Sequence, residues 1–256
     1  MKDVIFMSHY SAFARYYDEL TANINYKKRA EYFNEIIKKF KTTQGNILLD
    51  LACGTGSISE EMAKLGYDVI GVDNSDEMLG IALNKKFDSN LPIQYLCQDM
   101  RQLDMYGTID VTICALDSLN HLENINDVKE VLKKVSLFAE PNGLFIFDVN
   151  TIYKHREVLA NNTFTYETNN VYCIWENSLD SETNNVKINL EFFELMDNGL
   201  YERSSDNFIE TAFSIKTIET LLIDSGFKVL AVYGDDTFDS VKNDTLRAVF
   251  VARKIY

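Results

Sequence analysis

The stretch NILLDLACGTGSIS, residues 46–59, decides the fold because it joins a strand pattern to a helix pattern through a glycine loop. Its apolar run is short and ends at Asp50, which is typical of a buried parallel strand. Residues 57–65 follow with apolar side chains on one helical face. Between the two, Gly54 and Gly56 permit tight turning and close approach of the backbone to a ligand. The stretch therefore predicts a strand, a ligand-binding loop and a helix.

The same alternation continues downstream of this stretch. Strand patterns occupy 67–73, 92–99, 109–116 and 143–149, and helix patterns occupy 75–86 and 127–139. Strands that alternate with helices at this spacing predict a parallel sheet with helices on both faces. Ligands bind such sheets beyond the carboxyl ends of the strands, near the point where the strand order reverses.

Two regions depart from this alternation. Residues 10–41 show helical spacing, whereas 163–210 show a period near two and the hairpin signal Asp-Asn-Gly at 197–199. A helix and two strands then close the chain, which brings it back to the α/β pattern. We therefore predict an N-terminal helical cap at 1–41, a ligand-binding α/β core at 42–150 and 213–256, and an inserted antiparallel β lid at 151–212.

A net charge of −14 narrows the classes of partner. This field repels polyanions, and the sequence shows no cluster of Lys and Arg, so we expect no nucleic-acid partner. The four cysteines form no C-x-x-C pair and the three histidines are far apart, so we expect reduced thiols and no metal site. We find neither a signal-peptide core nor a membrane-length apolar run, and expect a cytoplasmic chain without membrane association.

The glycine loop leaves more than one ligand open. Asp73 ends the second strand 19 residues after Gly54, as in dinucleotide sites, where an acid at this place accepts hydrogen bonds from ribose hydroxyls. However, Ser59 stands where that fingerprint has its third glycine. Asp50, at the mouth of the loop, would repel a pyrophosphate and suit a positively charged ligand. The phosphate-loop pattern fails as well, because no Gly-Lys-Ser/Thr follows.

Five motifs in order resemble those of the class I S-adenosylmethionine-dependent methyltransferases. They are FARYYDEL (13–20), DLACGTG (50–56), VDNSDEML (72–79), CQDM (97–100) and CALDSLNHL (114–122). The chain looks similar to small-molecule members such as glycine and amino-sugar N-methyltransferases. This resemblance implies a Rossmann-like seven-stranded sheet, mostly parallel with an antiparallel last strand, and S-adenosylmethionine as cofactor. One mild departure is Ala52, where many members carry glycine.

The resemblance also implies a set of cofactor-binding positions. Three of them, Asp50, Asp73 and Asp99, have independent support because each carboxylate ends an apolar strand. At the methionine end of the cofactor, the resemblance implies contacts with Tyr17, with Asp50 and the loop residues Ala52, Gly54 and Gly56, and with the Leu116 carbonyl, which accepts from the ammonium group. Asp73 would bind the ribose hydroxyls. Around the adenine, the implied contacts are Asn74 and Met78 beside the ring, and Asp99 and the Met100 N–H at its amino edge.

These residues together predict transfer of a methyl group to a small-molecule acceptor, at nitrogen or oxygen, by in-line attack. His121 follows the fourth strand and is the candidate catalytic residue, because histidine can take a proton near neutral pH. Histidine at the start of a segment can also be only a cap. The alternatives are a nucleic acid or protein methyltransferase, a non-catalytic S-adenosylmethionine-binding protein and, more weakly, a NAD-dependent oxidoreductase. The chain has ALDSLN at 115–120, where base N-methyltransferases have an Asn/Asp-Pro-Pro-aromatic motif, and this difference argues against nucleic acid methylation.

Overall fold

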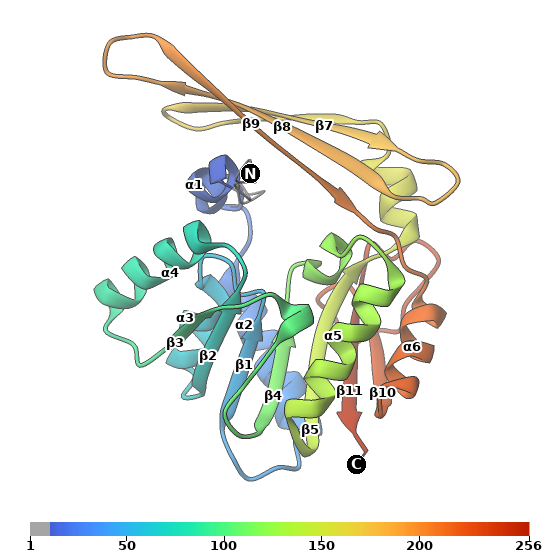
Figure 1. Cartoon of the computed structure of the whole chain (residues 1–256). Coiled ribbons are helices and arrows are strands. Elements are labelled where there is room, and N and C mark those ends of the chain that lie inside the picture. Colours follow the sequence, from blue (N-terminus) through green and yellow to red (C-terminus); the bar gives the residue numbers. More distant parts are fainter. Residues whose placement is uncertain (1–10, 256) are drawn as a thin grey trace, which may run out of the picture.

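A seven-stranded sheet forms the centre of the molecule in a computed structural model, which describes residues 11–255 (Figure 1). The strand order is β10-β11-β5-β4-β1-β2-β3. Strands from β5 to β3 pair in parallel, whereas β11 is antiparallel to both β5 and β10. This confirms the predicted mixed sheet with its antiparallel last strand. The bounds are β1 (Ile47–Leu51), β2 (Asp68–Asp73), β3 (Gln94–Cys97), β4 (Ile109–Cys114), β5 (Ala139–Asn150), β10 (Phe227–Gly234) and β11 (Arg247–Lys254).

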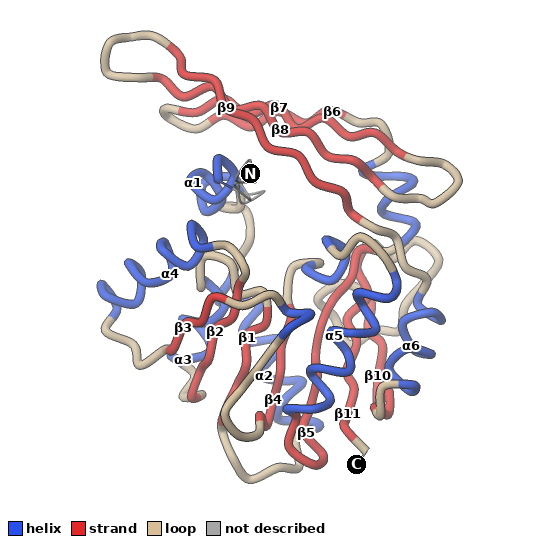
Figure 2. Tube along the Cα trace, viewed as in Figure 1, coloured by secondary structure: helices blue, strands red, loops and turns tan. Residues whose placement is uncertain are grey.

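Helices cover both faces of this sheet (Figure 2). One hydrophobic cluster joins the strands to α5 (Ile125–Phe138) and α6 (Ile215–Asp224). A second cluster joins them to α2 (Tyr26–Phe40) and α3 (Ser57–Lys64) on the other face. The helix α4 (Asp76–Ser89) lies beside β2 and β3. Since the apolar residues of each helix recur at helical spacing, one side of each helix is buried and the other faces water.

The predicted helical segment at 10–41 is divided into α1 (Ser11–Leu20) and α2. Asn25 begins the second helix, because its backbone is non-helical and its side chain accepts a hydrogen bond from the N–H of Lys28 at 2.9 Å. This is the N-cap geometry that begins a new helix. Residues 1–10 of the predicted cap, including His9, lie outside the described residues.

A separate four-stranded antiparallel sheet follows β5, as predicted. Its strands, in spatial order, are β6 (Thr163–Glu167), β7 (Val171–Leu179), β8 (Val186–Leu195) and β9 (Tyr201–Glu210). The turn between β8 and β9 contains Gly199 at φ +78°, a conformation that favours glycine. Between β5 and β6 lies a single π-helical stretch, η3 (Lys154–Leu159), which no periodic pattern in the sequence predicts.

The helix α1 lies between the four-stranded sheet and the central domain (Figure 1). Phe13 and Tyr16 belong to one hydrophobic cluster with residues of β7 and β8. The ring of Phe13 lies 5.9 Å from that of Phe208 on β9, and the hydroxyl of Tyr16 donates to Glu194 Oε2 at 2.5 Å. The face of α1 toward the sheet is therefore held by packing and by hydrogen bonds.

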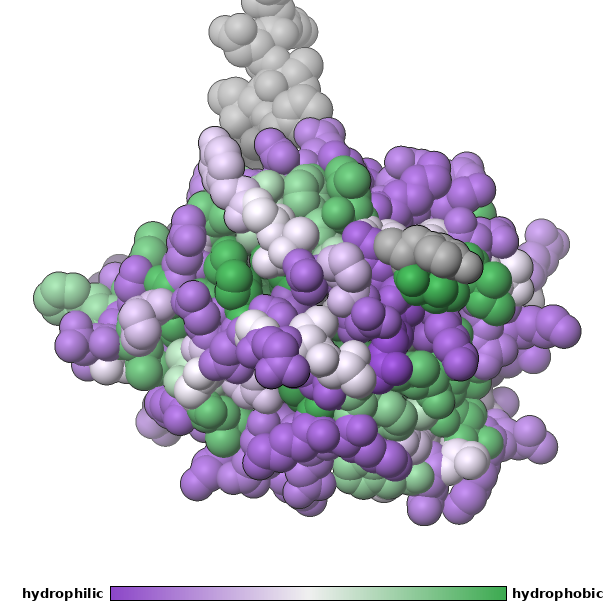
Figure 3. Space-filling view, turned by 90° about the horizontal axis from the view of Figure 1, so that it is seen from below, coloured by the Kyte–Doolittle hydropathy of each residue, from purple (hydrophilic) through white to green (hydrophobic). Residues whose placement is uncertain are grey.

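The surface seen from below Figure 1 carries many hydrophilic residues, with hydrophobic residues in smaller groups among them (Figure 3). Within residues 11–255, no helix combines the length and apolar character that a membrane crossing requires. This face lies at the end of the central sheet that is farthest from the four-stranded sheet.

Candidate cofactor and acceptor site

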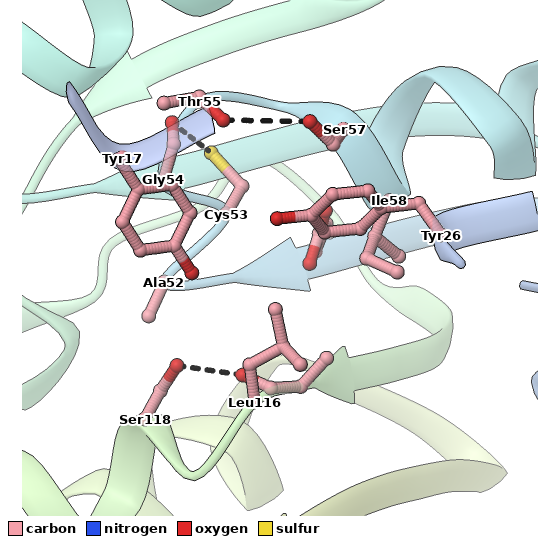
Figure 4. A pocket seen from close by; sticks show the side chains of 12 residues that line it. Tyr17, Tyr26, Ala52, Cys53, Gly54, Thr55, Ser57, Ile58, Leu116 and Ser118 are labelled. Carbon is pink, nitrogen blue, oxygen red and sulfur yellow. Dashed lines mark hydrogen bonds between the residues drawn. The ribbon is translucent and has the colours of Figure 1, made fainter. Parts of the chain in front are cut away.

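A pocket lies at the carboxyl ends of the neighbouring strands β1 and β4. The strands that follow β1 in the sequence, β2 and β3, extend the sheet to one side, whereas β5 extends it beyond β4 to the other side. Open α/β sheets bind their ligands at this switch point. The ring of Tyr17 points into this pocket in Figure 4. It is lined by Tyr17, Tyr26, Asp50, Ala52, Cys53, Gly54, Thr55, Ser57, Ile58, Ala115, Leu116 and Ser118.

The backbone around the pocket adopts the left-handed conformation on both strand ends. Gly54 and Gly56 have φ of +53° and +76°, and Ala52 has φ +59°. Leu116 and Asp117, after β4, have φ of +60° and +53°. For residues other than glycine this conformation is unfavourable by about 1–2 kcal/mol and gathers at ligand sites. A glycine at position 52, which the family resemblance leads us to expect, would adopt this positive φ without strain.

Asp73 ends β2 and reaches back to the glycine loop. Its Oδ2 accepts from the N–H of Gly54 at 2.8 Å, and its Oδ1 accepts from the N–H of Ser75 at 2.9 Å. Burial raises the pKa of Asp73, and these backbone hydrogen bonds oppose the rise. Each carboxylate oxygen has a second lone pair, so both oxygens can also accept a ligand hydroxyl.

Asp50 is buried below the loop, with 1% of its surface exposed. The hydroxyl of Ser59 donates to its Oδ2 at 2.6 Å. Burial raises the pKa of Asp50 to about 7, with the Ser59 hydrogen bond opposing the rise and the charge of Asp73 adding to it. Ser59 therefore does more than break the dinucleotide fingerprint, since it holds the carboxylate that lines the pocket.

The predicted adenine-side residues lie on three elements. Asn74 is exposed after β2, whereas Met78 on α4 is buried in the cluster that contains α1. Asp99 caps the short 3₁₀-helix η1 (Met100–Gln102). The guanidinium of Arg101 donates to Asp99 Oδ2 at 2.5 Å and lowers the pKa of this carboxyl. The roles of these residues at an adenine ring stay predictions.

A polar clasp joins α1 to the glycine loop and to α4, and sequence reasoning missed it. We use this name for Asp18, Thr55, Ser57 and Lys85. Thr55 Oγ1 donates to Asp18 Oδ1 at 2.7 Å, and Lys85 Nζ lies 2.7 Å from Asp18 Oδ2. Lys85 Nζ also donates to Ser57 Oγ at 2.8 Å. The clasp fixes Tyr17, the neighbour of Asp18, over the pocket.

His121 lies at the end of the short 3₁₀-helix η2 (Ser118–His121), beyond β4. Its ring centroid is 5.0 Å from that of Phe208 on the four-stranded sheet. One ring nitrogen of His121 and one carboxylate oxygen each from Asp117 and Glu210 lie within 4.8 Å of one another. Asn150 Nδ2 donates to Glu210 Oε2 at 2.8 Å and to Asp117 Oδ2 at 3.0 Å. His121 thus lies near the carboxylates of Asp117 and Glu210, and the Asn150 amide donates a hydrogen bond to each of them.

A buried ion-pair network supports Asp117. Arg247 Nη2 lies 2.6 Å from Asp117 Oδ1, and Arg247 Nη1 is paired with Asp148. Arg29 Nη2, from α2, lies 2.8 Å from Asp148 Oδ2. Burial acts to raise the pKa of Asp117, but the charges of Arg247, Lys154 and His121 lower it well below its ordinary value. Asp117 is therefore a carboxylate in the folded chain.

The pocket and its surroundings fit S-adenosylmethionine. Gly54 leaves its side-chain position open, since a Cβ there would meet nothing within 4 Å, and Asp73 can accept from ribose hydroxyls. The family model described as a methyltransferase domain matches residues 48–143. The putative methyltransferase YqeM of Bacillus subtilis (strain 168) is 33% identical over 246 residues, 96% of this chain and 97% of its own length. The chain belongs to the class I S-adenosylmethionine-dependent methyltransferases.

Solved structures agree with this membership. An S-adenosylmethionine-dependent methyltransferase from Clostridium acetobutylicum ATCC 824 has a TM-score of 0.85 at 31% identity, covering 96% of this methyltransferase and 98% of that chain. CalS10 from Micromonospora echinaspora, an amino pentose methyltransferase with S-adenosylmethionine bound, has a TM-score of 0.71 at 17% identity, covering 99% of both chains. The second likeness shows the fold alone. The predicted enzyme class and cofactor are confirmed.

We expect Asp73→Asn to weaken S-adenosylmethionine binding by about 10–100-fold, because hydrogen bonds to a charged group contribute about 1.5–3 kcal/mol. The amide keeps the shape of the carboxylate but has only one acceptor oxygen. Isothermal titration calorimetry measures the dissociation constant. Asp68→Asn, at the exposed start of the same strand, is the matched control and should bind as the wild type does. Equal affinity of Asp73→Asn and wild type would remove Asp73 from the cofactor site.

The affinity for S-adenosylmethionine should rise with pH, because the cofactor is cationic and favours the ionised form of Asp50. With a pKa of about 7 in the free protein, ionised Asp50 increases roughly eightfold between pH 6 and pH 7.5. Calorimetry in two buffers of different ionisation enthalpy should also detect proton release on binding. The Asp50→Asn variant should show a flat profile over this range. A flat profile in the wild type would contradict the assignment.

Proposed function

We propose that this methyltransferase methylates a nitrogen or oxygen atom of a small-molecule acceptor, which α1 and the four-stranded sheet would cover. The position of α1 is the observation that carries the proposal. One side of α1 packs on β7, β8 and β9, and the other side is tied to the glycine loop by the clasp. This covering suits a small acceptor better than a nucleic acid or a folded protein. The net charge of −14 also disfavours nucleic acid.

In this proposal the cap at 1–41 and the lid at 151–212 close over the core formed by 42–150 and 213–256. Tyr17, Asp50 and Leu116 would hold the methionine end of the cofactor, Asp73 the ribose, and Asn74, Met78, Asp99 and Met100 the adenine. Bound S-adenosylmethionine supplies an activated methyl group. The chain supplies alignment of the reacting groups, which can contribute about 7–11 kcal/mol. His121 would accept the proton that the acceptor loses, contributing about 3–5 kcal/mol.

The choice of acceptor class is tested by release of S-adenosylhomocysteine. Purified full-length protein is incubated with S-adenosylmethionine and separate pools of amines, amino sugars, phenols and other hydroxylated compounds, and carboxylic acids. Transfer RNA and unfolded protein serve as macromolecular pools. We expect release above the acceptor-free rate with one small-molecule pool. Release only with a macromolecule would overturn the proposal, and tight cofactor binding without release from any pool would favour the non-catalytic alternative.

A further inference from the structure

His155, on η3, is fully buried beside Glu210. Its Nδ1 lies 2.8 Å from the carbonyl oxygen of Asn184. A carbonyl can only accept, so Nδ1 carries a hydrogen. The other ring nitrogen, Nε2, is buried without a hydrogen-bond partner and lies 3.4 Å from Glu210 Oε2. If both groups lacked a proton, a lone pair would face a buried carboxylate, which is unfavourable. A single proton between the two groups removes this conflict.

Glu210 is held in place by a second group, the side chain of Asn150. Lys154 Nζ lies 2.8 Å from Asn150 Oδ1, and an ammonium group can only donate, so the amide NH₂ must face the opposite way. There it donates to Glu210 Oε2 and to Asp117 Oδ2. Asn120 fixes the same segment, because its Oδ1 accepts from the N–H of Asn150 at 2.9 Å. The Asn150 side chain thus fixes the orientation of the Glu210 and Asp117 carboxylates.

The charges around Glu210 come from several elements. Lys154 and His155 lie on η3, Asp117 and His121 on the segment after β4, and Arg247 on β11. Arg247 is already paired with Asp117 and with Asp148. Lys154 Nζ donates to Asn150 Oδ1, so this ammonium group is engaged by the amide rather than by Glu210. His155 is consequently the group best placed to balance Glu210.

We propose that Glu210 and His155 form a proton-sharing pair, and that Glu210 acts as a positioning residue for His121. This rests on the proposed function. When the acceptor loses its proton, the proton moves to a ring nitrogen of His121 and creates an imidazolium. The carboxylate of Glu210, within 4.8 Å, faces that new positive charge. The proton of the pair stays with His155, so Glu210 remains negative during the transfer.

The pair can be observed without any acceptor. The chain has only three histidines, His9, His121 and His155, so His→Asn substitutions assign every ring signal in long-range ¹H–¹⁵N spectra of the full-length protein with S-adenosylhomocysteine. At pH 7 we expect Nε2 of His155 to show a protonated or proton-sharing shift. In Glu210→Gln the negative charge that faces Nε2 is lost, so Nε2 should change to the shift of an unprotonated nitrogen. The ring signals of His121 should move as well.

Glu194→Gln is the matched control, because Glu194 lies on the neighbouring strand and bonds Tyr16 rather than the histidines. It should leave both rings unchanged. Glu210→Asp is a second variant that keeps the negative charge, and it should show the same His155 signal as the wild type. It tests the pair even if Glu210→Gln folds poorly. Once the acceptor is identified, Glu210→Gln should lower kcat about tenfold, which is a part of the rate contribution expected of a general base. The dissociation constant of the cofactor should stay unchanged.

A bare Nε2 on His155 in the wild type would overturn the proposal, as would unchanged His121 signals in Glu210→Gln. These outcomes differ from failure of the proposed function. Spectra that behave as expected, combined with methylation of a macromolecule alone, would keep the pair and reject the small-molecule acceptor.

Discussion

Replacing Arg247 with methionine should lower the free energy of unfolding by about 3–5 kcal/mol, because it removes one partner from a buried ion-pair network. Arg247 pairs with Asp117 and with the fully buried Asp148. Arg29 would remain beside Asp148, but Asp148 Oδ1 already has no hydrogen-bond partner, so the variant would leave this carboxylate poorly compensated. Methionine retains much of the side-chain volume, which limits any contribution from a cavity.

Urea denaturation followed by circular dichroism measures this difference through the midpoint at constant m-value. Arg203→Met is the matched control, since Arg203 makes the same kind of pair with Glu191 but has 66% of its side chain exposed. Exposed pairs contribute about 0–1 kcal/mol, so this control should stay close to the wild type. Equal midpoints for the two variants would show that the network around Arg247 adds no more stability than a surface pair.

The stability difference should also depend on pH in a defined direction. The pKa of Asp117 in the folded chain lies below the ordinary value of 3.8, so its ion pair stabilises the fold above that pH. This contribution is lost as the pH falls through the folded pKa and the carboxylate becomes protonated. The gap between the wild type and Arg247→Met should accordingly narrow in acid.

The order of core elements could be predicted because each strand and helix carries its own local pattern. The apolar run before Asp50 and the alternation up to residue 149 require no knowledge of distant contacts. The break between α1 and α2 was missed because apolar spacing continues across it, although Asn25 is a residue type that favours a helix start. The π-helical turn at η3 has no periodic signal, since π-helices occur mainly as single irregular turns.

The supporting contacts of the candidate site join residues that are far apart in the sequence, which explains why sequence reasoning missed them. Thr55 and Asp18 are 37 residues apart, Asn150 and Glu210 are 60 apart, and Arg247 and Asp148 are 99 apart. Local periodicity carries no information on such pairs. Strand-end acids such as Asp73 are different, because the carboxyl ends of parallel strands meet at one edge of the sheet.

His121→Ala should lower kcat by about 10²–10⁴-fold with the identified acceptor, which is the usual contribution of a general base. The dissociation constant of S-adenosylmethionine should stay within about twofold, because His121 is not among the residues that line the cofactor pocket. Kinetics at saturating cofactor and calorimetry measure the two quantities separately.

Loss of packing is the competing explanation, because the His121 ring lies against Phe208. His121→Phe restores an aromatic ring without an ionisable nitrogen, and it should be as slow as His121→Ala if the base matters. Phe208→Leu disturbs the same contact and keeps the imidazole, so it should retain most of the activity. If His121→Phe turns over the acceptor at the wild-type rate, the ring only packs, and proton removal must be assigned to another group. Asp117 or Glu210 would then be the carboxylates to test, because both lie within 4.8 Å of His121.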